Sequence, residues 1–353
     1  MKTPSVTVGQ AFKDCQDSNK NVLIDIRSPA ERQGGIPPNS LAIEANNLLN
    51  YAKENFKKSH TYYIICQKGI SSETAVDLLM TNGMTNSLNV EKGFEHWQQC
   101  KLPVEIPTIT THDLRYSRHY QLQGFGKQAQ DKLSGAHVLL VGVGGLGSSS
   151  ALYLAAAGVG TITIIDDDIV QLSNLQRQII HTTVSIDTLK VNSAKERMQA
   201  INPEISIQTI TQRLDTNNAE QLIAQADVVI DGTDNLSTRY LVNDLCVKLK
   251  KVLIYAAVYQ FEAQISVFDM RDESSPCLRC LFPFTEGFEP ENCSTQGVLG
   301  VVPGYAGILQ ASEAIKIIAQ VGKTLQNKLL ISNLLDNSFR TINYKKDKNC
   351  TLH

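Results

Sequence analysis

Short apolar runs alternate with segments of helical spacing along most of the chain. Within the first hundred residues, NVLIDIRS (21–28) and TYYIIC (61–66) have the apolar content of short buried strands. SETAVDLLMTNG (72–83) has the spacing of a helix and ends at a glycine. The segment KLPVEIPTITTHD (101–113) contains two prolines and no clear period. We therefore predict a small α/β domain at 1–104 and a linker at 105–112.

A second series of strands and helices occupies residues 113–353. HVLLVGVGGLG (137–147) is an apolar strand that enters a glycine-rich turn, and TITIIDDD (161–168) is a strand that ends in acids. Further strands are expected at 205–212, 227–232, 252–258 and 263–269, helices at 148–160, 188–202, 219–225 and 304–321, and a hairpin at 329–346. Strands that alternate with helices predict a Rossmann-like, mostly parallel sheet with helices on both faces.

Composition narrows the class of protein. A chain of 353 residues suggests two or three domains, and a net charge of −2 argues against nucleic acid as the main partner. The N-terminus lacks the pattern of a signal peptide, and no apolar stretch reaches membrane-spanning length. We expect a cytoplasmic protein that does not contact a membrane and whose eight cysteines are reduced.

The glycine-rich turn is a candidate nucleotide site. Its glycines are Gly142, Gly144, Gly145 and Gly147. Backbone amides at the start of the following helix can hold phosphate oxygens. Asp166 ends the next strand, about 20 residues further on, where an acid usually binds ribose hydroxyls. This pattern alone would favour NAD, and the alternative is a tight turn that binds no ligand.

The residues after Asp166 favour ATP chemistry over NAD. Asn174 and Arg177 follow it closely, and Lys190 stands at the start of a helix. Asp234 comes after a further strand, where a carboxylate could bind Mg²⁺. An enzyme that attacks a phosphate and expels pyrophosphate needs such cations, because negative charge must be neutralised as it develops. The alternative for Arg177 and Lys190 is an ordinary solvated surface.

Several motifs occur in the order found in one enzyme family. GVGGLG, DDDIVQLSNLQRQ, LKVNSA, DGTDN and GVLGVVPGYAGILQASEAIKII resemble adenylyltransferases that activate ubiquitin-like sulfur carriers. These enzymes serve molybdopterin and thiamine biosynthesis and are relatives of ubiquitin-activating enzymes. The resemblance extends from about Arg115 to the last residue. It implies a homodimer that binds MgATP and a β-grasp carrier ending in Gly-Gly, whose terminal carboxylate attacks the α-phosphate.

The resemblance also assigns roles to matching positions. Asp166 would bind the ribose, Asn174, Arg177 and Lys190 the phosphates, and Asp234 would lie beside Mg²⁺. In RYSRHYQLQGFG, Arg118 matches an arginine that the family inserts into the active site of the other subunit. The alternative for Arg118 is a surface arginine near the linker.

Two pairs of soft ligands predict a zinc site. Cys277 and Cys280 form one pair, and Cys350 and His353 form the other, each with two residues between them. The family resembled here has Cys-x-x-Cys at both places, so His353 departs from it, although imidazole is an acceptable zinc ligand. We expect a structural site that pins the C-terminal tail. Unligated cysteines or a Cys277–Cys280 redox pair are the alternatives.

The first domain resembles a rhodanese. LIDIRSPAER, GGIPPNS, IICQKGISSETAVDLL and NVEKGFEHW carry the resemblance over most of residues 5–100. It implies a persulfide on Cys66, held by backbone amides of the loop that follows. Ser71 replaces the usual arginine of that loop, and Gly34-Gly35-Ile36-Pro37 replaces Gly-His-Ile-Pro. A degenerate, carrier-docking or structural domain is therefore the alternative to persulfide transfer.

The two domains fit one reaction sequence. Adenylation makes the carrier's terminal carbonyl electrophilic, and a Cys66 persulfide, loaded by a donor such as a cysteine desulfurase, would attack it. Cys293 matches a cysteine that many relatives carry on a loop over the site, and it is the candidate second thiol that releases the thiocarboxylate. The alternative for Cys293 is an ordinary loop cysteine. The pathway stays open among molybdopterin, thiamine, tRNA thiolation and cysteine synthesis. The competing functions are an NAD-dependent oxidoreductase, a non-catalytic scaffold and an adenylyltransferase with an inert rhodanese domain.

Overall fold

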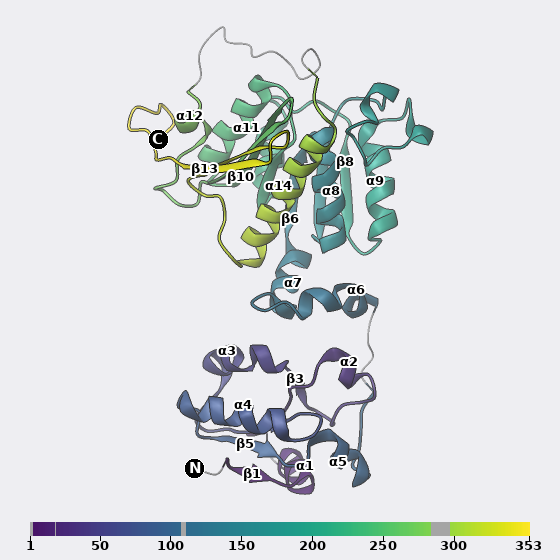
Figure 1. Cartoon of the computed structure of the whole chain (residues 1–353), viewed down its shortest axis with the longest axis vertical. Helices are drawn as coiled ribbons and strands as arrows, with labels where there is room; N and C mark the ends of the chain where they lie inside the picture. The colour runs from purple at the N-terminus through teal and green to yellow at the C-terminus, as the bar shows by residue number, and fades with distance from the viewer. Residues whose placement is uncertain (1–2, 18, 107–110, 284–296) are drawn as a thin grey trace. The chain divides into compact units, whose positions relative to one another are not determined.

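The computed structural model describes residues 3–17, 19–106, 111–283 and 297–353. The chain divides into two compact units, Met1–Gly126 and Lys127–His353 (Figure 1). The division falls after the expected linker, because a helix, α6 (Thr111–Tyr120), begins inside that segment and groups with the first unit. Each unit has its own sheet.

The sheet of the first unit has five parallel strands in the order β1-β5-β4-β2-β3. The strands are β1 (Ser5–Val6), β2 (Asn21–Asp25), β3 (Leu41–Ala42), β4 (Thr61–Ile65) and β5 (Ser87–Val90). The helices are α1 (Val8–Asp17), α2 (Pro29–Arg32), α3 (Ala45–Asn55), α4 (Ile70–Thr81) and α5 (Gly93–Gln99).

Alternating residues of the central strands divide the core of this unit into two layers. Ile24 and Ile64 are buried with residues of α3 and α4, whereas Leu23 and Tyr63 are buried with residues of α1 and α5. Both faces of the parallel sheet are therefore covered by helices, as its near-continuous apolar strands predict. Cys66 follows directly after β4 and belongs to the layer with α3 and α4.

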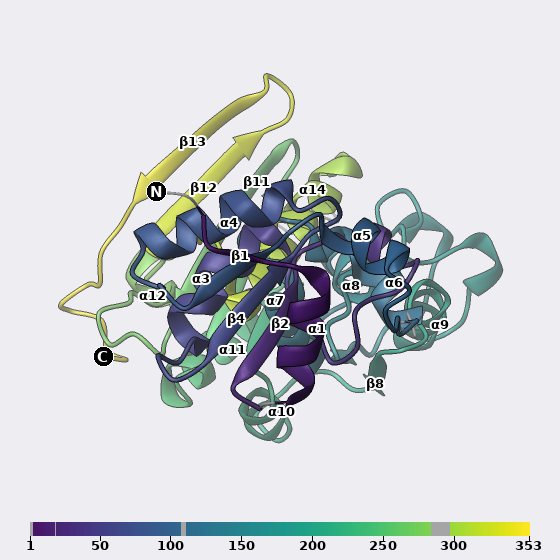
Figure 2. The same ribbon diagram turned by 90° about the horizontal axis from the view of Figure 1, so that it is seen from below.

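The second unit has an eight-stranded sheet in the order β13-β12-β11-β10-β9-β6-β7-β8. The parallel strands are β6 (His137–Val141), β7 (Thr161–Ile165), β8 (Ser206–Ile210), β9 (Val228–Asp231) and β10 (Val252–Tyr259). The antiparallel strands are β11 (Glu262–Asp269), β12 (Lys328–Asn333) and β13 (Ser338–Asn343). Figure 2 shows the β12–β13 hairpin, in yellow, at the edge of this sheet, as expected from the sequence.

Helices cover both faces of the larger sheet. The helices of this part of the chain are α7 (Gly126–Gly135), α8 (Gly145–Ala157), α9 (Lys190–Ile201), α10 (Ala219–Gln225), α11 (Leu236–Lys248), α12 (Leu278–Leu281) and α14 (Val301–Ala319). Residues of α8 and α14 share a buried cluster with Ala256 and Ile265, and residues of α10 and α11 share another with Val229 and Leu253. The predicted fold class is confirmed.

The strand order reverses beside β6. From β6 the chain proceeds outward to β7 and β8, and it then returns to the other side of β6 to form β9 and β10. Such a switch point leaves a crevice at the carboxyl ends of the two diverging strands, here β6 and β9, and ligands of open α/β sheets bind there. Among the helices of the described residues, none is long and apolar enough to cross a membrane.

Candidate functional site

The glycine turn lies at the switch point, and two of its glycines leave no room for a side chain. Gly142 follows β6 with φ of +86°, in the left-handed region that favours glycine, and its N–H donates to the Ile165 carbonyl at 2.9 Å. A Cβ atom on Gly142 would lie 2.9 Å from the Gly232 carbonyl oxygen. A Cβ atom on Gly147 would lie 2.2 Å from the Gly142 carbonyl oxygen. Glycine is therefore required where the loops after β6 and β9 touch.

Asp166 is fixed beside this turn. Its Oδ2 accepts a hydrogen bond from the Val143 amide at 2.9 Å, and its Oδ1 accepts one from the Asp168 amide at 2.9 Å. Burial raises the pKa of Asp166, and the Val143 amide and the charge of Lys190 oppose that rise. The two amides hold the carboxylate at the carboxyl end of β7.

A cavity of about 800 Å³ brings together most of the residues expected to bind nucleotide. Those that line it are Gly142, Gly144, Gly145, Asp166, Arg177, Lys190 and Asp234. They come from the glycine turn, the end of β7, the segment before α9, the start of α9 and the loop after β9. Residues that are far apart in sequence therefore face one space.

The cations of the cavity differ in how they are held. The Lys190 ammonium lies 2.7 Å from Asp168 Oδ2, and the lysine side chain is 7% exposed. Arg177 is half-buried, and its Nη1 donates to the Ser173 carbonyl at 3.1 Å. Asp234 is exposed at the cavity, just before α11. The site thus has several cations and several carboxylates, which suits a polyphosphate with a divalent metal ion.

Other residues expected at the site are placed differently. Gly147 and Asn174 are not among the described residues that line the cavity. Asn174 is buried, and its Oδ1 accepts a hydrogen bond from the Gln171 amide at 3.1 Å. Arg118 lies on α6 in the first unit with an exposed side chain, and Cys293 lies outside the described residues.

One cation that lines the cavity, Arg239, was not predicted from the sequence, and it pairs with the buried Asp231. Arg239 Nε lies 2.9 Å from Asp231 Oδ2, and Arg239 Nη2 donates to the Thr233 carbonyl at 2.6 Å. Burial alone would lower the pKa of Arg239, but Asp231, Tyr255 and Asp234 together outweigh it, so that pKa is raised. The pair ties the start of α11 to the end of β9 and so fixes the loop that carries Asp234. An arginine five residues after Asp234 was the available signal.

Gln178 also lines the cavity and was missed. Its side chain is 4% exposed, and its Oε1 has no hydrogen-bond partner among the described residues. A buried acceptor without a partner is costly unless a ligand completes it. The cavity therefore fits a bound polar group better than a permanently empty space.

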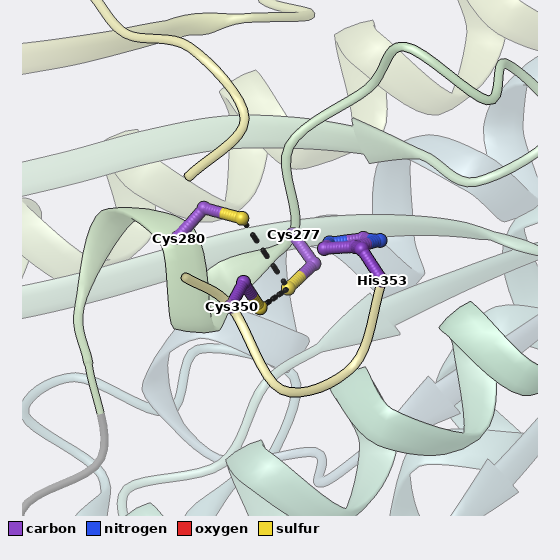
Figure 3. A group of neighbouring side chains, drawn as sticks. All are labelled: Cys277, Cys280, Cys350 and His353. Atoms are coloured by element: carbon purple, nitrogen blue, oxygen red, sulfur yellow. Dashed lines mark hydrogen bonds between the residues drawn. The ribbon is translucent and has the colours of Figure 1, made fainter. Parts of the chain in front are cut away.

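The four expected zinc ligands come together in the second unit (Figure 3). Cys277 Sγ lies 3.9 Å from Cys280 Sγ and 3.8 Å from Cys350 Sγ, and all four ligand atoms, including one of His353, lie within 4.8 Å of one another. Thiolates about 2.3 Å from a tetrahedral zinc ion would be about 3.8 Å apart. The donor set and its spacing therefore fit Zn²⁺.

The zinc-ligand cluster is joined to α11. The Leu278 amide donates to Asn243 Oδ1 at 2.8 Å, and the Arg279 guanidinium lies 2.6 Å from Asp244 Oδ2. Both acceptors belong to α11, whose first turns border the nucleotide cavity. A metal held by Cys277 and Cys280 would thus be fixed to the same helix as Arg239.

Cys66 lies at the base of a loop that wraps its sulfur. The amides of Gly69 and Ser72 donate to Cys66 Sγ at 3.1 and 3.3 Å, and Ser72 Oγ lies 3.2 Å from it. Gly69 has φ of +85°, and a Cβ atom there would lie 2.5 Å from the Lys92 amide nitrogen. This tight loop leads directly into α4, so the sulfur faces the N-terminal amides of that helix.

A cavity of about 530 Å³ opens beside Cys66. Its charged and loop residues include Arg27, Glu31, Glu44, Lys68 and Ser71. Arg27 is buried, pairs with Asp25 at 2.6 Å and stacks on the Phe94 ring at 3.6 Å. Its charge is therefore neutralised within the fold, and it does not replace the arginine expected at position 71. Lys68 is the exposed cation of this loop.

Comparisons with known proteins agree with this geometry. Residues 116–352 match the ThiF family, and residues 9–100 match the rhodanese-like domain. The chain is 41% identical over 239 residues to the SAMP-activating enzyme E1 of Haloferax volcanii, covering 67% of this chain and 87% of that protein. It is 40% identical over 241 residues to a sulfur carrier protein adenylyltransferase of Thermus thermophilus, covering 67% and 89%.

A longer relative and a solved structure complete the comparison. The adenylyltransferase and sulfurtransferase MOCS3 of Culex quinquefasciatus is 45% identical over 235 residues, and the match spans 66% of this chain but only 53% of that relative. The crystal structure of Escherichia coli MccB with ATP has the same fold, with a TM-score of 0.60 and 24% identity over 69% of this chain and 74% of that one. Both the predicted family and the enzyme class, an adenylyltransferase, are confirmed. The chain belongs to the ThiF family of adenylyltransferases and carries a rhodanese-like domain ahead of its ThiF region.

Proposed function

We propose that this protein adenylates the C-terminal glycine of a ubiquitin-like sulfur carrier with ATP and then transfers sulfur to it through a persulfide on Cys66. The observation that carries the first step is the shared cavity of the glycine turn, Asp166, Arg177, Lys190 and Asp234. The relatives named above as adenylyltransferases and SAMP-activating enzyme support the carrier as the class of substrate.

The residues of the cavity have complementary roles in adenylation. Amides at the start of α8 bind phosphate oxygens, and Asp166 accepts hydrogen bonds from the ribose hydroxyls. The carrier's carboxylate forms a bond to the α-phosphorus while the bond to pyrophosphate breaks, and Arg177 and Lys190 stabilise the charge that develops. Mg²⁺ beside Asp234 would neutralise the departing pyrophosphate.

Asn174 acts as a support for the phosphate-binding segment. Its backbone carbonyl accepts hydrogen bonds from the amides of Arg177 at 3.1 Å and Gln178 at 2.9 Å. Its side chain closes the preceding turn, as described above. In this proposal Asn174 fixes the position of Arg177 and Gln178, which themselves face the nucleotide.

Sulfur transfer uses the electrophile that adenylation creates. The outer sulfur of the Cys66 persulfide forms a bond to the glycine carbonyl carbon, and the bond to AMP breaks. A second thiol, for which Cys293 is the candidate, then attacks the Cys66 sulfur. The thiocarboxylate leaves with the electron pair of the broken S–S bond, and the disulfide left on the enzyme is returned to thiols by an external dithiol.

The charges around Cys66 favour a donor that is a protein persulfide, as a cysteine desulfurase would carry. Glu31 and Glu44 line the cavity, and Arg27 is already paired with Asp25. A small dianion such as thiosulfate would meet two carboxylates and one exposed lysine, Lys68. A persulfide on a donor protein carries less negative charge than thiosulfate, and the donor protein can make further contacts with the surface around Cys66.

The proposed assembly is a homodimer with a structural zinc ion. Arg118, exposed on α6, would enter the nucleotide cavity of a second copy and stabilise the phosphates there. Cys277, Cys280, Cys350 and His353 would hold the zinc ion and pin the tail against α11. Four protein ligands would occupy all the coordination positions of a tetrahedral zinc ion, which is typical of a structural site.

Two assays separate the steps of this proposal. Pyrophosphate exchange into ATP, with a panel of β-grasp carriers ending in Gly-Gly, tests adenylation, and mass spectrometry of the carrier tests thiocarboxylate formation. Cys66→Ala should keep the exchange and lose the thiocarboxylate, whereas the control Cys100→Ala, an exposed cysteine on the same unit, should keep both. Equal thiocarboxylate yields from the two variants would remove sulfur transfer from Cys66. Tight NAD binding without exchange would favour an oxidoreductase.

A further inference from the structure

The hydroxyl of Ser72 lies between two buried hydrogen-bond acceptors. Its oxygen is 2.7 Å from Asn89 Oδ1 and 3.2 Å from Cys66 Sγ. Ser72, Asn89 and Cys66 are 0%, 3% and 5% exposed, so water does not replace a missing partner. A hydroxyl has one proton and cannot donate fully to both acceptors at once. The ionisation state of the sulfur therefore decides where this proton points.

In the thiol state the proton points to Asn89. The amide oxygen of Asn89 is closer to Ser72 Oγ than the sulfur is, and a neutral sulfur is only a weak acceptor. The Cys66 S–H can then donate to a lone pair of Ser72 Oγ. The buried chain Cys66–Ser72–Asn89 is satisfied in this state.

In the thiolate state the preference reverses. Hydrogen bonds to an ionised acceptor are about twice as strong as neutral ones, so the Ser72 hydroxyl turns to the sulfur and joins the amide donors of Gly69 and Ser72. Asn89 Oδ1 then loses its donor inside the fold, which has a free-energy cost. Asn89 thus opposes ionisation of Cys66, whereas Ser72 favours it.

We propose that Ser72 is a catalytic hydrogen-bond donor to the Cys66 sulfur, and that Asn89 is a positioning residue that withdraws this donor whenever the sulfur is uncharged. The proposal rests on the proposed persulfide chemistry of Cys66. It assigns a function to two residues, one on α4 and one on β5, to which the sequence motifs gave no individual role.

The switch follows the charge through the loading step. The Cys66 thiolate attacks the outer sulfur of the donor's persulfide, a new S–S bond forms at Cys66, and the donor's S–S bond breaks with its electron pair leaving on the donor's thiolate. Negative charge leaves Cys66 Sγ, and the hydroxyl returns to Asn89. When an acceptor such as cyanide removes the outer sulfur as thiocyanate, the electron pair returns to Sγ and Ser72 donates to it again.

Other charged groups face Cys66 but do not depend on this hydroxyl. Arg27, Glu31, Glu44 and Lys68 line the cavity in front of the sulfur. Ser72 Oγ is within hydrogen-bonding distance of the sulfur and of Asn89 Oδ1, and both of these residues are buried. Substitutions of Ser72 and Asn89 therefore leave the charges of the cavity in place.

The test is the rate at which iodoacetamide alkylates Cys66 in the full-length protein, followed by peptide mass spectrometry across a range of pH. Ser72→Ala should slow alkylation at neutral pH by about tenfold, because a hydrogen bond to a charged group is lost. Its rate should approach that of the wild type at high pH, where the thiolate forms without help. Asn89→Leu should accelerate alkylation several-fold, because the hydroxyl becomes free for the sulfur. Ser87→Ala, a buried residue on the same face of β5, is the matched control and should leave the rate unchanged.

The double variant separates this switch from a packing effect. If Asn89 acts only through the Ser72 hydroxyl, Ser72→Ala/Asn89→Leu should react as slowly as Ser72→Ala. A loosened fold would instead expose Cys66 and accelerate the double variant, which would overturn the proposal. Asn89→Asp, which keeps a polar side chain of similar size, should slow alkylation because a carboxylate competes more strongly for the proton. An Asn89→Leu rate equal to or below the wild-type rate would also overturn it. Alkylation needs no sulfur transfer, so loss of thiocarboxylate formation with this pattern intact would count against the proposed function alone.

Discussion

Lys190→Met removes the most buried cation of the nucleotide cavity. The lysine side chain is 7% exposed, whereas its partner Asp168 is 67% exposed and stays solvated after the substitution. The loss of stability should therefore be small, roughly 1 kcal/mol or less, as for pairs that water screens. The loss of catalysis should be large, because removing one donor aimed at developing charge costs about 10²–10³ in rate.

The same substitution should change the pH dependence of adenylation. Burial raises the pKa of Asp166, and the charge of Lys190 opposes that rise. Without Lys190 the pKa of Asp166 rises further. Since the ionised carboxylate is the form that accepts ribose hydrogen bonds, activity should be lost at a higher pH in the variant than in the wild type as the solution is acidified.

The assay is pyrophosphate exchange with a saturating carrier, together with calorimetric titration of ATP. Lys195→Met is the matched control, because it removes the same charge from the same helix at a residue outside the cavity lining. We expect Lys190→Met to lose about two to three orders of magnitude in exchange, with a melting temperature close to that of the control. Equal exchange rates for Lys190→Met and Lys195→Met would refute the role assigned to Lys190.

Three further predictions follow from the proposed assembly and its sites. Arg118→Ala and Lys190→Met should each be inactive in pyrophosphate exchange. An equimolar mixture that has been allowed to re-associate should recover about a quarter of wild-type activity, because half of the dimers then carry one intact site. No recovery would argue against an arginine supplied by a second copy. His353→Ala should bind zinc more weakly than wild type by elemental analysis and melt several degrees lower, whereas His353→Cys should retain the metal; unchanged zinc content in His353→Ala would exclude the imidazole as a ligand. Glu44→Gln should increase the rate of sulfur transfer from thiosulfate to cyanide several-fold, because one carboxylate of the Cys66 cavity is neutralised. An unchanged rate would show that the charge of Glu44 does not disfavour thiosulfate as the sulfur donor.

Local motifs could be predicted from the sequence because their chemistry depends on a few adjacent residues. The glycine turn, Asp166 and the Cys66 loop lie where a strand ends, and the structure places them at the ends of β6, β7 and β4. Cys277 is close to the C-terminal ligands in space, although no local pattern joins the two segments. The pairing was predicted because each segment carries two soft ligands at the same spacing, and the family resembled has Cys-x-x-Cys at both places.

Side-chain contacts that depend on which face of a helix or strand a residue occupies were not predicted from the sequence. Asp231 and Arg239 lie on a strand and on the next helix, and their pairing depends on how far α11 turns before Arg239 reaches back. Ser72 and Asn89 are 17 residues apart, and nothing in the sequence around either residue indicates that their side chains are in contact. Asn174 Oδ1 closes its own turn, since short polar side chains compete for nearby backbone groups, and its expected role at the phosphates stays a prediction.

Helix boundaries deviated for physical reasons. The helix expected at 304–321 begins at Val301, and Pro303 lies in its first turn, where a missing N–H costs nothing. The helix expected at 72–83 begins at Ile70, because Gly69 in the left-handed conformation reverses the chain directly after the Cys66 loop. Both helices therefore begin two or three residues earlier than the sequence pattern predicts.

The most direct test of the central claim is a mass measurement of the carrier after incubation with the purified protein, Mg²⁺ and ATP. We expect a carrier whose terminal glycine is linked to AMP, formed by the wild type and by Cys66→Ala but not by Lys190→Met. If a full panel of β-grasp proteins ending in Gly-Gly never yields the AMP-linked product, the cavity at the switch point does not adenylate a carrier, and the account is contradicted.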